Sequence, residues 1–390
     1  MRRALLLALP LIALAVWLWT SAELPGSSPP PVAARAVFSP AQIDRAQSYR
    51  ETGYLLALTV LGLQLLAVWL LAWRGRRWAA RLPAVVAAAA VAAVVALVPL
   101  PIEYWQHLRA RDAGIDLRGG WAWASDAALS ASLWVIAVAA VYAIGRVAYR
   151  RRGALAVAVS AWAAVALFTA LQPVAIDPLF ISTRPLPGAA AAQAAQLERQ
   201  MGVDAPLSVS DASSRSTAKN AMVVGLGPTV RVVVDDTSLA QQPGQLRALL
   251  AHELAHVSRR HTLEGVLWFG VIGLPAILLV LAAAGRLTGG RPAAAAAVPV
   301  LLACALTMAT LLLPVENLIS RRIESEADWA GLRATQDPAG MASLNRRLAL
   351  ADLSNPAPPS WAVWLLFDHP PVMERISVAR AYPSSSGSSP

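Results

Sequence analysis

The sequence predicts an all-α polytopic membrane protein with about seven transmembrane helices and a small α+β region outside the bilayer. The first observation is composition: 57% of the 390 residues are apolar and only 14% are charged, whereas soluble domains carry roughly 25% charged residues. The second is that apolar runs close to the ~20 residues required by a bilayer core recur along the chain. These runs cover residues 4–19, 54–73, 82–102, 127–148, 154–176, 263–285 and 293–314.

The first apolar run has two interpretations. Met1-Arg2-Arg3, a short apolar run and Thr20-Ser21-Ala22 also describe a cleavable signal peptide. We expect a retained anchor instead, because proteins with many spans rarely require cleavage.

Polar blocks alternate with these spans. We expect five spans, the first part of a polar region, two further spans, the second part of that region and a disordered Ser/Gly-rich tail. These parts are residues 1–176, 177–262, 263–314, 315–382 and 383–390.

The first polar block carries signals for both strands and helices. Short β-branched runs with glycine and proline between them predict strands at residues 207–211, 221–225 and 229–235. Residues 189–201 and 243–260 are expected to form helices.

Charge and cysteine content exclude several classes of protein. The single cysteine, Cys304, lies in an apolar run, so a disulfide scaffold and a Cys-ligated zinc ribbon are both excluded. The net charge of +10 comes almost wholly from arginine, because Lys219 is the sole lysine. The arginines cluster between apolar runs, which is typical of a membrane protein and not of a nucleic-acid surface. We therefore expect a bilayer partner and no nucleic acid; nothing in the sequence indicates an oligomeric state.

The arginine clusters also predict an orientation. They occupy alternate connections between spans, and the positive-inside rule places such connections in the cytoplasm. Both polar blocks would then lie on the extracytoplasmic side. The clusters are Arg2 and Arg3; Arg74, Arg76, Arg77 and Arg81; Arg146 and Arg150 to Arg152; Arg286 and Arg291.

The segment His252-Glu253-Leu254-Ala255-His256 has the pattern H-E-x-x-H. Two histidines four residues apart on a helix differ by about 40° in azimuth, so both imidazoles face one point. This spacing suits two ligands of a tetrahedral zinc ion. Glu253 lies about 100° round from His252, beside the metal, where it can accept a proton from water.

A catalytic zinc needs a third protein ligand and an open position. His261 and Glu264 follow the motif, but on a continuous helix His261 would point about 140° away and Glu264 would lie about 18 Å from His252. The better source is the segment that contains Glu324 and Asp328, which share a helix face. One of them can bind zinc while the other orients a ligand histidine, and Arg321 can neutralise both. The remaining candidates are Glu316 and Glu326.

Taken together, these motifs resemble those of the type I CAAX prenyl protease family of integral-membrane zinc metallopeptidases. Besides H-E-x-x-H, the chain has Glu324 with Asp328, an Asn220-Ala221 pair, and His369-Pro370-Pro371 followed by Glu374-Arg375-Ile376. The motifs stand in the family's order. The arginine-dominated, alanine-rich composition suggests a bacterial member.

The resemblance implies a role for each matching residue. His252, His256 and Glu324 would hold one Zn²⁺ per chain, Glu253 would be the base, and Asp328 would support a ligand. His369 would stabilise the oxyanion, and Asn220 would bind substrate. The resemblance also implies membrane helices around a water-filled chamber, with zinc near one membrane face. Eukaryotic relatives place that face in the cytosol, in conflict with the arginine pattern.

The sequence therefore predicts an endopeptidase acting on proteins or peptides. Two alternatives stay open: a membrane protein with a structural zinc and no catalysis, and a zinc hydrolase of non-peptide amides or lipids. Structural zinc usually has four protein ligands, whereas three converge in this prediction. A base such as Glu253 would also have no purpose there. No prenyl pocket is recognisable in the sequence.

Overall fold

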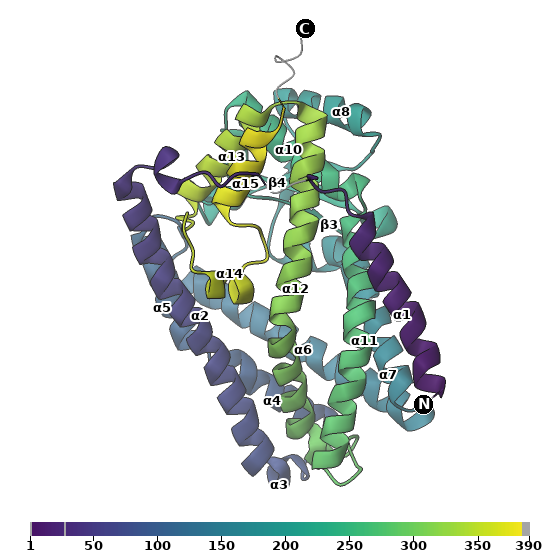
Figure 1. Cartoon of the computed structure of the whole chain (residues 1–390). Helices are drawn as coiled ribbons and strands as arrows, with labels where there is room; N and C mark the ends of the chain where they lie inside the picture. The colour runs from purple at the N-terminus through teal and green to yellow at the C-terminus, as the bar shows by residue number, and fades with distance from the viewer. Residues whose placement is uncertain (1, 27–28, 384–390) are drawn as a thin grey trace.

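The structure is a computed structural model that describes residues 2–26 and 29–383. Figure 1 shows long helices running along one axis, with the short strands and the α/β helices gathered at one end. The expected disorder of the tail lies, from residue 384 on, outside the described residues. The long helices are α1 (Arg2–Ser21), α2 (Pro40–Arg74), α4 (Ala84–Leu97), α5 (Leu100–Asp112), α6 (Gly120–Arg152), α7 (Ala154–Leu171), α11 (His261–Leu287) and α12 (Val298–Thr335).

The predicted fold class is confirmed. Within the described residues, six helical segments are long and apolar enough to cross a bilayer. The apolar part of α1, Ala8–Ser21, is shorter, and α1 packs along α11. Helices α6 and α7 expose large apolar side chains such as Ile136, Ile144 and Leu167, as expected of surfaces that face lipid.

Helix α2 begins well before the apolar run predicted at residue 54. Ser39 caps the helix, because its Oγ accepts a hydrogen bond from Gln42 N while Gln42 Oε1 accepts one from Ser39 N. Pro40 occupies the first helical position. A capping box with proline at this position starts a helix efficiently, so polar residues extend the span beyond the bilayer core.

Two other predicted boundaries also differ. The run at 82–102 is divided, since α4 ends at Leu97 and α5 begins at Leu100, where Pro99 and Pro101 interrupt the backbone hydrogen bonds. Conversely, the expected boundary at residue 314 falls inside α12, which continues through Pro314 to Thr335. The candidate ligand Glu324 therefore lies on the extension of a membrane helix.

The α/β region contains a mixed sheet of four strands in the described part of the chain, in the order β1-β2-β4-β3. Strands β2 and β4 are parallel, and the two outer pairs are antiparallel. The three predicted strands are confirmed to within two residues. β1 was missed because it is short, exposed and ends in proline. The strands are β1 (Thr183–Pro185), β2 (Leu207–Ser210), β3 (Ala221–Val224) and β4 (Arg231–Asp235).

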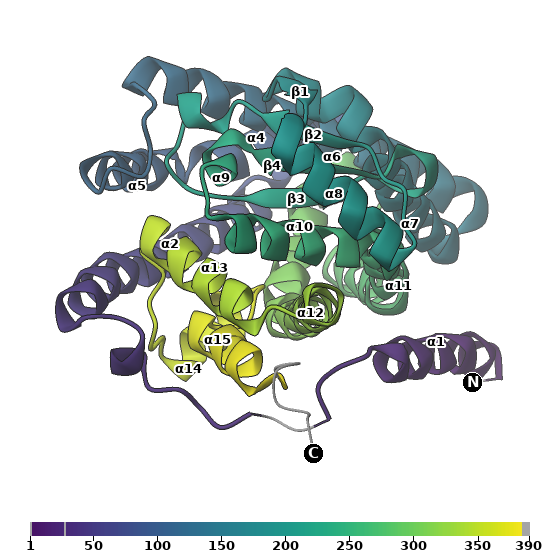
Figure 2. The same cartoon turned by 90° about the horizontal axis from the view of Figure 1, so that it is seen from above.

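Helices pack against this sheet and build the core beneath the site. Figure 2 shows α8 and α10 beside the strands, with α12, α13 and α15 on the other side of α10. Fully buried Val232, Val234, Leu250 and Leu344 join the sheet to α10 and α13. The helices of this region are α8 (Gly188–Met201), α9 (Asp236–Leu239), α10 (Pro243–Ser258), α13 (Pro338–Ala351), α14 (Ser360–Leu366) and α15 (Val372–Ala381).

Short helical turns complete the described chain. The four-residue helix α3 (Arg76–Ala79) connects α2 to α4, and a π-helical turn follows α7 at Gln172–Ile176. The 3₁₀ turns are Ala34–Ala36, Asp177–Leu179, Ala212–Ser214, Gly227–Thr229 and Ala295–Ala297.

Candidate metal centre and active site

Three candidate ligand residues from two helices converge on one point. His252 Nε2 lies 3.2 Å from His256 Nε2 on α10 and 3.3 Å from Glu324 Oε2 on α12. His256 Nε2 lies 3.5 Å from Glu324 Oε1. Ligands at 2.0–2.1 Å from a tetrahedral ion are separated by about 3.3 Å, so this triangle fits such an ion and leaves a fourth position for solvent or substrate.

Burial supports a cation at this point. His252 and Glu324 are both buried. Glu324 Oε2 accepts no well-aligned hydrogen bond from the described residues, although His252 Nε2 and His369 Nε2 each lie 3.3 Å away. An unpaired buried carboxylate oxygen is costly. A metal ion would satisfy it together with the two imidazole lone pairs.

Small residues allow α12 to approach α10 closely enough to bring Glu324 to the histidines. Buried Ala255 packs against Ala327 and Ala330. A β-carbon added at Gly331 would lie only 3.2 Å from the backbone nitrogen of His252. The contact between α10 and α12 that brings the three ligand residues together therefore depends on small side chains along this face.

A buried ion pair supports His252 from behind. His252 Nδ1 lies 3.0 Å from Asp328 Oδ1, and both Asp328 oxygens accept hydrogen bonds from Arg375, from Nε at 2.7 Å and from Nη2 at 2.6 Å. Because an ionised carboxylate can only accept hydrogen bonds, the short separation places the proton of His252 on Nδ1. This contact orients Nε2 toward the metal position.

Arg321 does not take the expected place beside Glu324 and Asp328. Its guanidinium Nη1 instead donates to the carbonyl oxygens of Val363 and Phe367, at 2.9 and 2.6 Å. It therefore ties α12 to the segment that leads to His369. Arg375, 47 residues from Asp328 in sequence, provides the charge that was expected of Arg321.

His256 has a support that the sequence analysis missed. Its Nδ1 lies 2.9 Å from His261 Nδ1, and His261 Nε2 lies 3.7 Å from Glu326 Oε2. Arg260 makes this possible, because its left-handed φ of 58° separates α10 from α11. The rotation of His261 expected on a continuous helix therefore does not apply.

Metal ligation by His256 determines which imidazole donates the hydrogen bond between His256 and His261. If His256 ligates through Nε2, its proton is on Nδ1, which donates to His261 Nδ1. His261 then carries its own proton on Nε2, facing the Glu326 carboxylate. The donor atoms of His261, Glu264 and Glu326 also lie within 4.8 Å of one another. However, a protonated Nε2 has no lone pair for a second metal, so His261, with Glu326 behind it, serves to position His256.

We expect His261→Phe to weaken metal binding by about 10- to 100-fold, because the imidazole of His256 loses the acceptor that fixes its proton on Nδ1. Competition with a chelator of known affinity measures the change. The stoichiometry should stay at one metal per chain, and the matched variant Glu264→Gln should bind as the wild type does. Two metals in the wild type and one in Glu264→Gln would contradict this assignment.

His369 lies next to the metal position, and Glu253 follows His252 on α10, close enough for the charges of Glu324 and His369 to act on it. Glu253 is buried on α10, and burial raises its pKa to about 7. His369 Nε2 lies 3.3 Å from Glu324 Oε2, while its Nδ1 lies 2.9 Å from the Asp368 carboxylate. Burial lowers the pKa of His369, but the Asp368 hydrogen bond and the charge of Glu324 outweigh burial and raise it. The site thus brings a buried carboxyl and an imidazole to one ion position.

A polar cavity of about 950 Å³ opens beside this centre. Asn220, at the start of β3, lines it together with His369 and Arg375. His107 and Arg118, which sequence reasoning did not assign to the site, also line this cavity. Both contact the Asp116 carboxylate, His107 through Nδ1 at 2.8 Å and Arg118 through Nη2 at 2.7 Å. Asn220 thus lies in the same cavity as the metal-proximal imidazole.

Comparisons with known proteins agree with this geometry. Residues 189–382, which include every ligand candidate, match the model of peptidase family M48. The chain is 29% identical over 221 residues to the uncharacterized metalloprotease YhfN of Bacillus subtilis, covering 54% of this chain and 52% of that protein. It is 32% identical over 190 residues to the protease HtpX homolog of Kineococcus radiotolerans, covering 42% of this chain and 64% of that protein. The chain thus spans about half the length of the first of these relatives.

The whole fold has a counterpart among solved structures. The crystal structure of S. mikatae Ste24p superposes with a TM-score of 0.71 at 18% identity, over 95% of this chain and 98% of that one. The membrane helices and the α/β region therefore share one known architecture. The segment that carries all three ligand candidates, residues 189–382, is the part of this chain that matches the model of peptidase family M48.

Proposed function

We propose that this protein is a membrane-embedded, zinc-dependent endopeptidase that hydrolyses peptide bonds of protein or peptide substrates. The observation that carries the proposal is the convergence of His252, His256 and Glu324 within 3.2 to 3.5 Å of one another. Two imidazoles and one carboxylate with an open fourth position are the ligand set of catalytic zinc, whereas structural zinc sites are closed by four protein ligands.

Glu253 and His369 have separate roles in the proposed reaction. When bound, zinc supplies a Lewis acid and makes water acidic near neutral pH. Glu253 accepts a proton from the water whose oxygen attacks the scissile carbonyl carbon. The C–N bond then breaks, and Glu253 passes that proton to the leaving amine. Because Asp368 accepts the hydrogen bond from Nδ1, the His369 imidazolium can donate from Nε2 to the carbonyl oxygen as it becomes negative.

Substrate alignment is assigned to β3. In the described residues this strand has one neighbour, β4, and forms the last strand of the sheet. An extended peptide can pair with such an edge through backbone hydrogen bonds. The Asn220 side chain is exposed where β3 begins and faces the polar cavity. It would hold the peptide backbone next to His369.

The proposal predicts complete and reversible dependence on metal. Treatment of the detergent-solubilised protein with 1,10-phenanthroline should abolish cleavage of an unfolded protein such as casein, and stoichiometric Zn²⁺ should restore it. Activity that survives removal of all measurable metal would contradict the proposal. Restoration of metal content without any cleavage would favour a structural ion.

We also propose that the site faces away from the cytoplasm. The loops between α2 and α4, α6 and α7, and α11 and α12 gather at the end of the molecule opposite the sheet (Figure 1). These loops and their flanks carry most of the arginine clusters described above. The positive-inside rule places that end in the cytoplasm.

Cysteine accessibility tests this orientation. In intact cells, a membrane-impermeant maleimide should label exposed Gln196→Cys on α8 and spare exposed Arg151→Cys at the other end. The native Cys304 is buried and gives the background. Labelling of Arg151→Cys alone would reverse the assignment, in accord with a cytosolic site.

A further inference from the structure

We propose that a second cavity, between the membrane helices, binds one anionic phospholipid. This cavity of about 500 Å³ lies toward the arginine-rich end and shares no lining residue with the polar cavity at the metal centre. Its volume falls in the range of roughly 300–1,000 Å³ that is usual for ligand pockets. Its walls come from α4, α6, α7, α11 and α12, and from the loop before α12.

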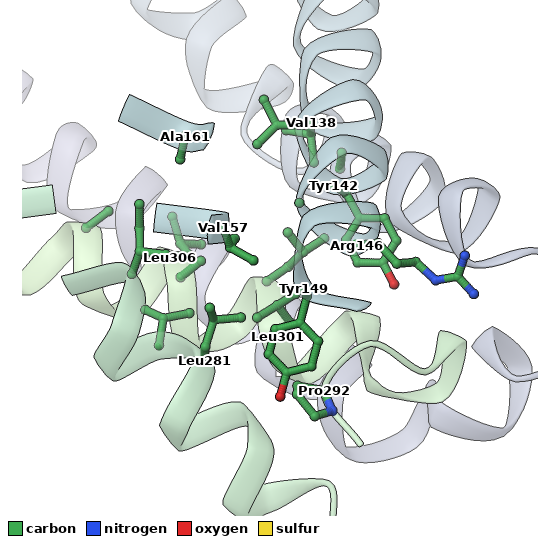
Figure 3. Close-up of a pocket in the computed structure, with 18 of the residues that line it drawn as sticks. Val138, Tyr142, Arg146, Tyr149, Val157, Ala161, Leu281, Pro292, Leu301 and Leu306 are labelled. Atoms are coloured by element: carbon green, nitrogen blue, oxygen red, sulfur yellow. The ribbon is translucent and has the colours of Figure 1, made fainter. Parts of the chain in front are cut away.

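The walls are almost wholly aliphatic. Figure 3 shows Val157 and Ala161 of α7 together with Leu281, Leu301 and Leu306 across from α6. Water finds no hydrogen-bond partners along such walls. Because the cavity lies among helices that face lipid, the apolar molecule available to fill it is an acyl chain.

Apart from the Trp134 indole, the polar side chains of the lining lie on one stretch of α6. Tyr142, Arg146 and Tyr149 line the cavity one after another along the helix (Figure 3). In Figure 3 the guanidinium of Arg146 extends away from the aliphatic side chains, which places it at the rim. Toward the other end α6 contributes Val138 and Trp134. From Arg146 to Trp134 the helix rises about 18 Å, comparable to one leaflet of a ~30 Å hydrocarbon core. The cavity thus has a polar end and a long apolar body, as an amphiphile does.

At the polar end of the cavity, the Tyr142 hydroxyl lacks a hydrogen-bond acceptor among the described residues. Its side chain is 8% exposed, and its hydroxyl has no hydrogen-bond partner among the described residues. A phenol buried without a partner is costly. An ester carbonyl of a glycerolipid, which lies next to the acyl chain, would accept this hydrogen bond.

The positive charge of Arg146 indicates which kind of lipid headgroup binds at the polar end. Arg146 is half-buried and uses Nε to donate to Ala293 O at 3.2 Å, and no carboxylate forms an ion pair with it in the described part of the chain. Exposed Arg150, Arg151 and Arg152 follow on the same helix. Clustered arginines at a membrane surface attract anionic lipid. The occupant is therefore a phospholipid with its phosphate at Arg146 and one chain along α6.

Native mass spectrometry of the full-length protein in detergent, titrated with dioleoyl phosphatidylglycerol, tests this proposal. The wild type should retain one lipid per chain, and dioleoyl phosphatidylcholine should bind more weakly. Arg146→Gln should lower the affinity for phosphatidylglycerol by about tenfold, because a charge-assisted hydrogen bond is lost. Ala305→Phe should lower it further by filling the apolar body. Arg150→Gln removes the same charge from an exposed position outside the lining, so it should lower the affinity by much less than Arg146→Gln does.

Several outcomes would overturn the proposal. Equal losses in Arg146→Gln and Arg150→Gln would show general surface attraction, and unchanged binding in both cavity variants would show annular lipid only. If the protein retained phosphatidylcholine as well as it retains phosphatidylglycerol, the cavity would have no preference for an anionic headgroup. Metal content and thermal unfolding show that each variant is folded. Tyr142→Phe, which changes one hydroxyl, gives a second reading with little risk to folding: its affinity for phosphatidylglycerol should also fall.

Discussion

Glu253→Gln is expected to lower kcat/KM for peptide hydrolysis by at least about 10³-fold while leaving the Zn²⁺ content unchanged. The glutamine side chain has nearly the same shape, so α10 keeps His252 and His256 in place. It cannot, however, accept the proton from the attacking water or return it to the leaving amine. The paired measurements are metal content by mass spectrometry and cleavage of a quenched fluorescent peptide.

Glu264→Gln is the matched control for this variant. Glu264 is partly buried on α11, and its carboxylate accepts a hydrogen bond from Trp268 Nε1 at 3.1 Å, away from the three ligand atoms. The same chemical change there should leave kcat/KM within about twofold of the wild type. Full activity in Glu253→Gln would eliminate the proposed mechanism. Loss of both metal and activity would instead give Glu253 a structural role.

Arg375→Leu is expected to destabilise the fold by about 3–5 kcal/mol, because it leaves the buried Asp328 carboxylate without its partner. The same variant should bind Zn²⁺ about 10- to 100-fold more weakly, since Asp328 would no longer be held against His252. Chemical denaturation measures the first effect, and chelator competition measures the second.

Two further variants separate charge from packing at this position. The double variant Asp328→Asn with Arg375→Leu buries no unpaired charge, so most of the stability should return while zinc binding stays weak. Arg380→Leu removes an exposed arginine from the same helix and should change the free energy of unfolding by less than about 0.5 kcal/mol. If Arg375→Leu behaves like Arg380→Leu, the Asp328 ion pair contributes nothing to the site.

Local patterns were sufficient for part of the site. The two histidines of H-E-x-x-H lie one turn apart, so the geometry of a single helix orients them. The spacing of Glu324 and Asp328 likewise placed both on one face of α12. The sequence also predicted most membrane helices, because their apolar length is imposed by the bilayer and not by neighbours in the fold.

The residues that support the ligands depend on contacts distant in sequence or on a backbone feature that spacing does not reveal. The sequence predicts that Arg321 neutralises Asp328 because both lie on one helix, but a carbonyl of α14 accepts a hydrogen bond from the Arg321 guanidinium instead. His261 was set aside on the assumption that the helix continues, whereas the left-handed conformation of Arg260 turns the chain. Neither the hydrogen bond between Arg321 and a carbonyl of α14 nor a left-handed arginine leaves a signal in local hydropathy.

X-ray absorption at the zinc edge, measured on the zinc-loaded protein, tests the central claim most directly. We expect one zinc per chain with only nitrogen and oxygen neighbours at about 2.0–2.2 Å, two of them imidazoles. Glu324→Gln should change that spectrum and weaken binding, while Glu264→Gln should not. A spectrum with a single imidazole, or one that Glu324→Gln leaves unaltered, would contradict the convergence of His252, His256 and Glu324 on one ion.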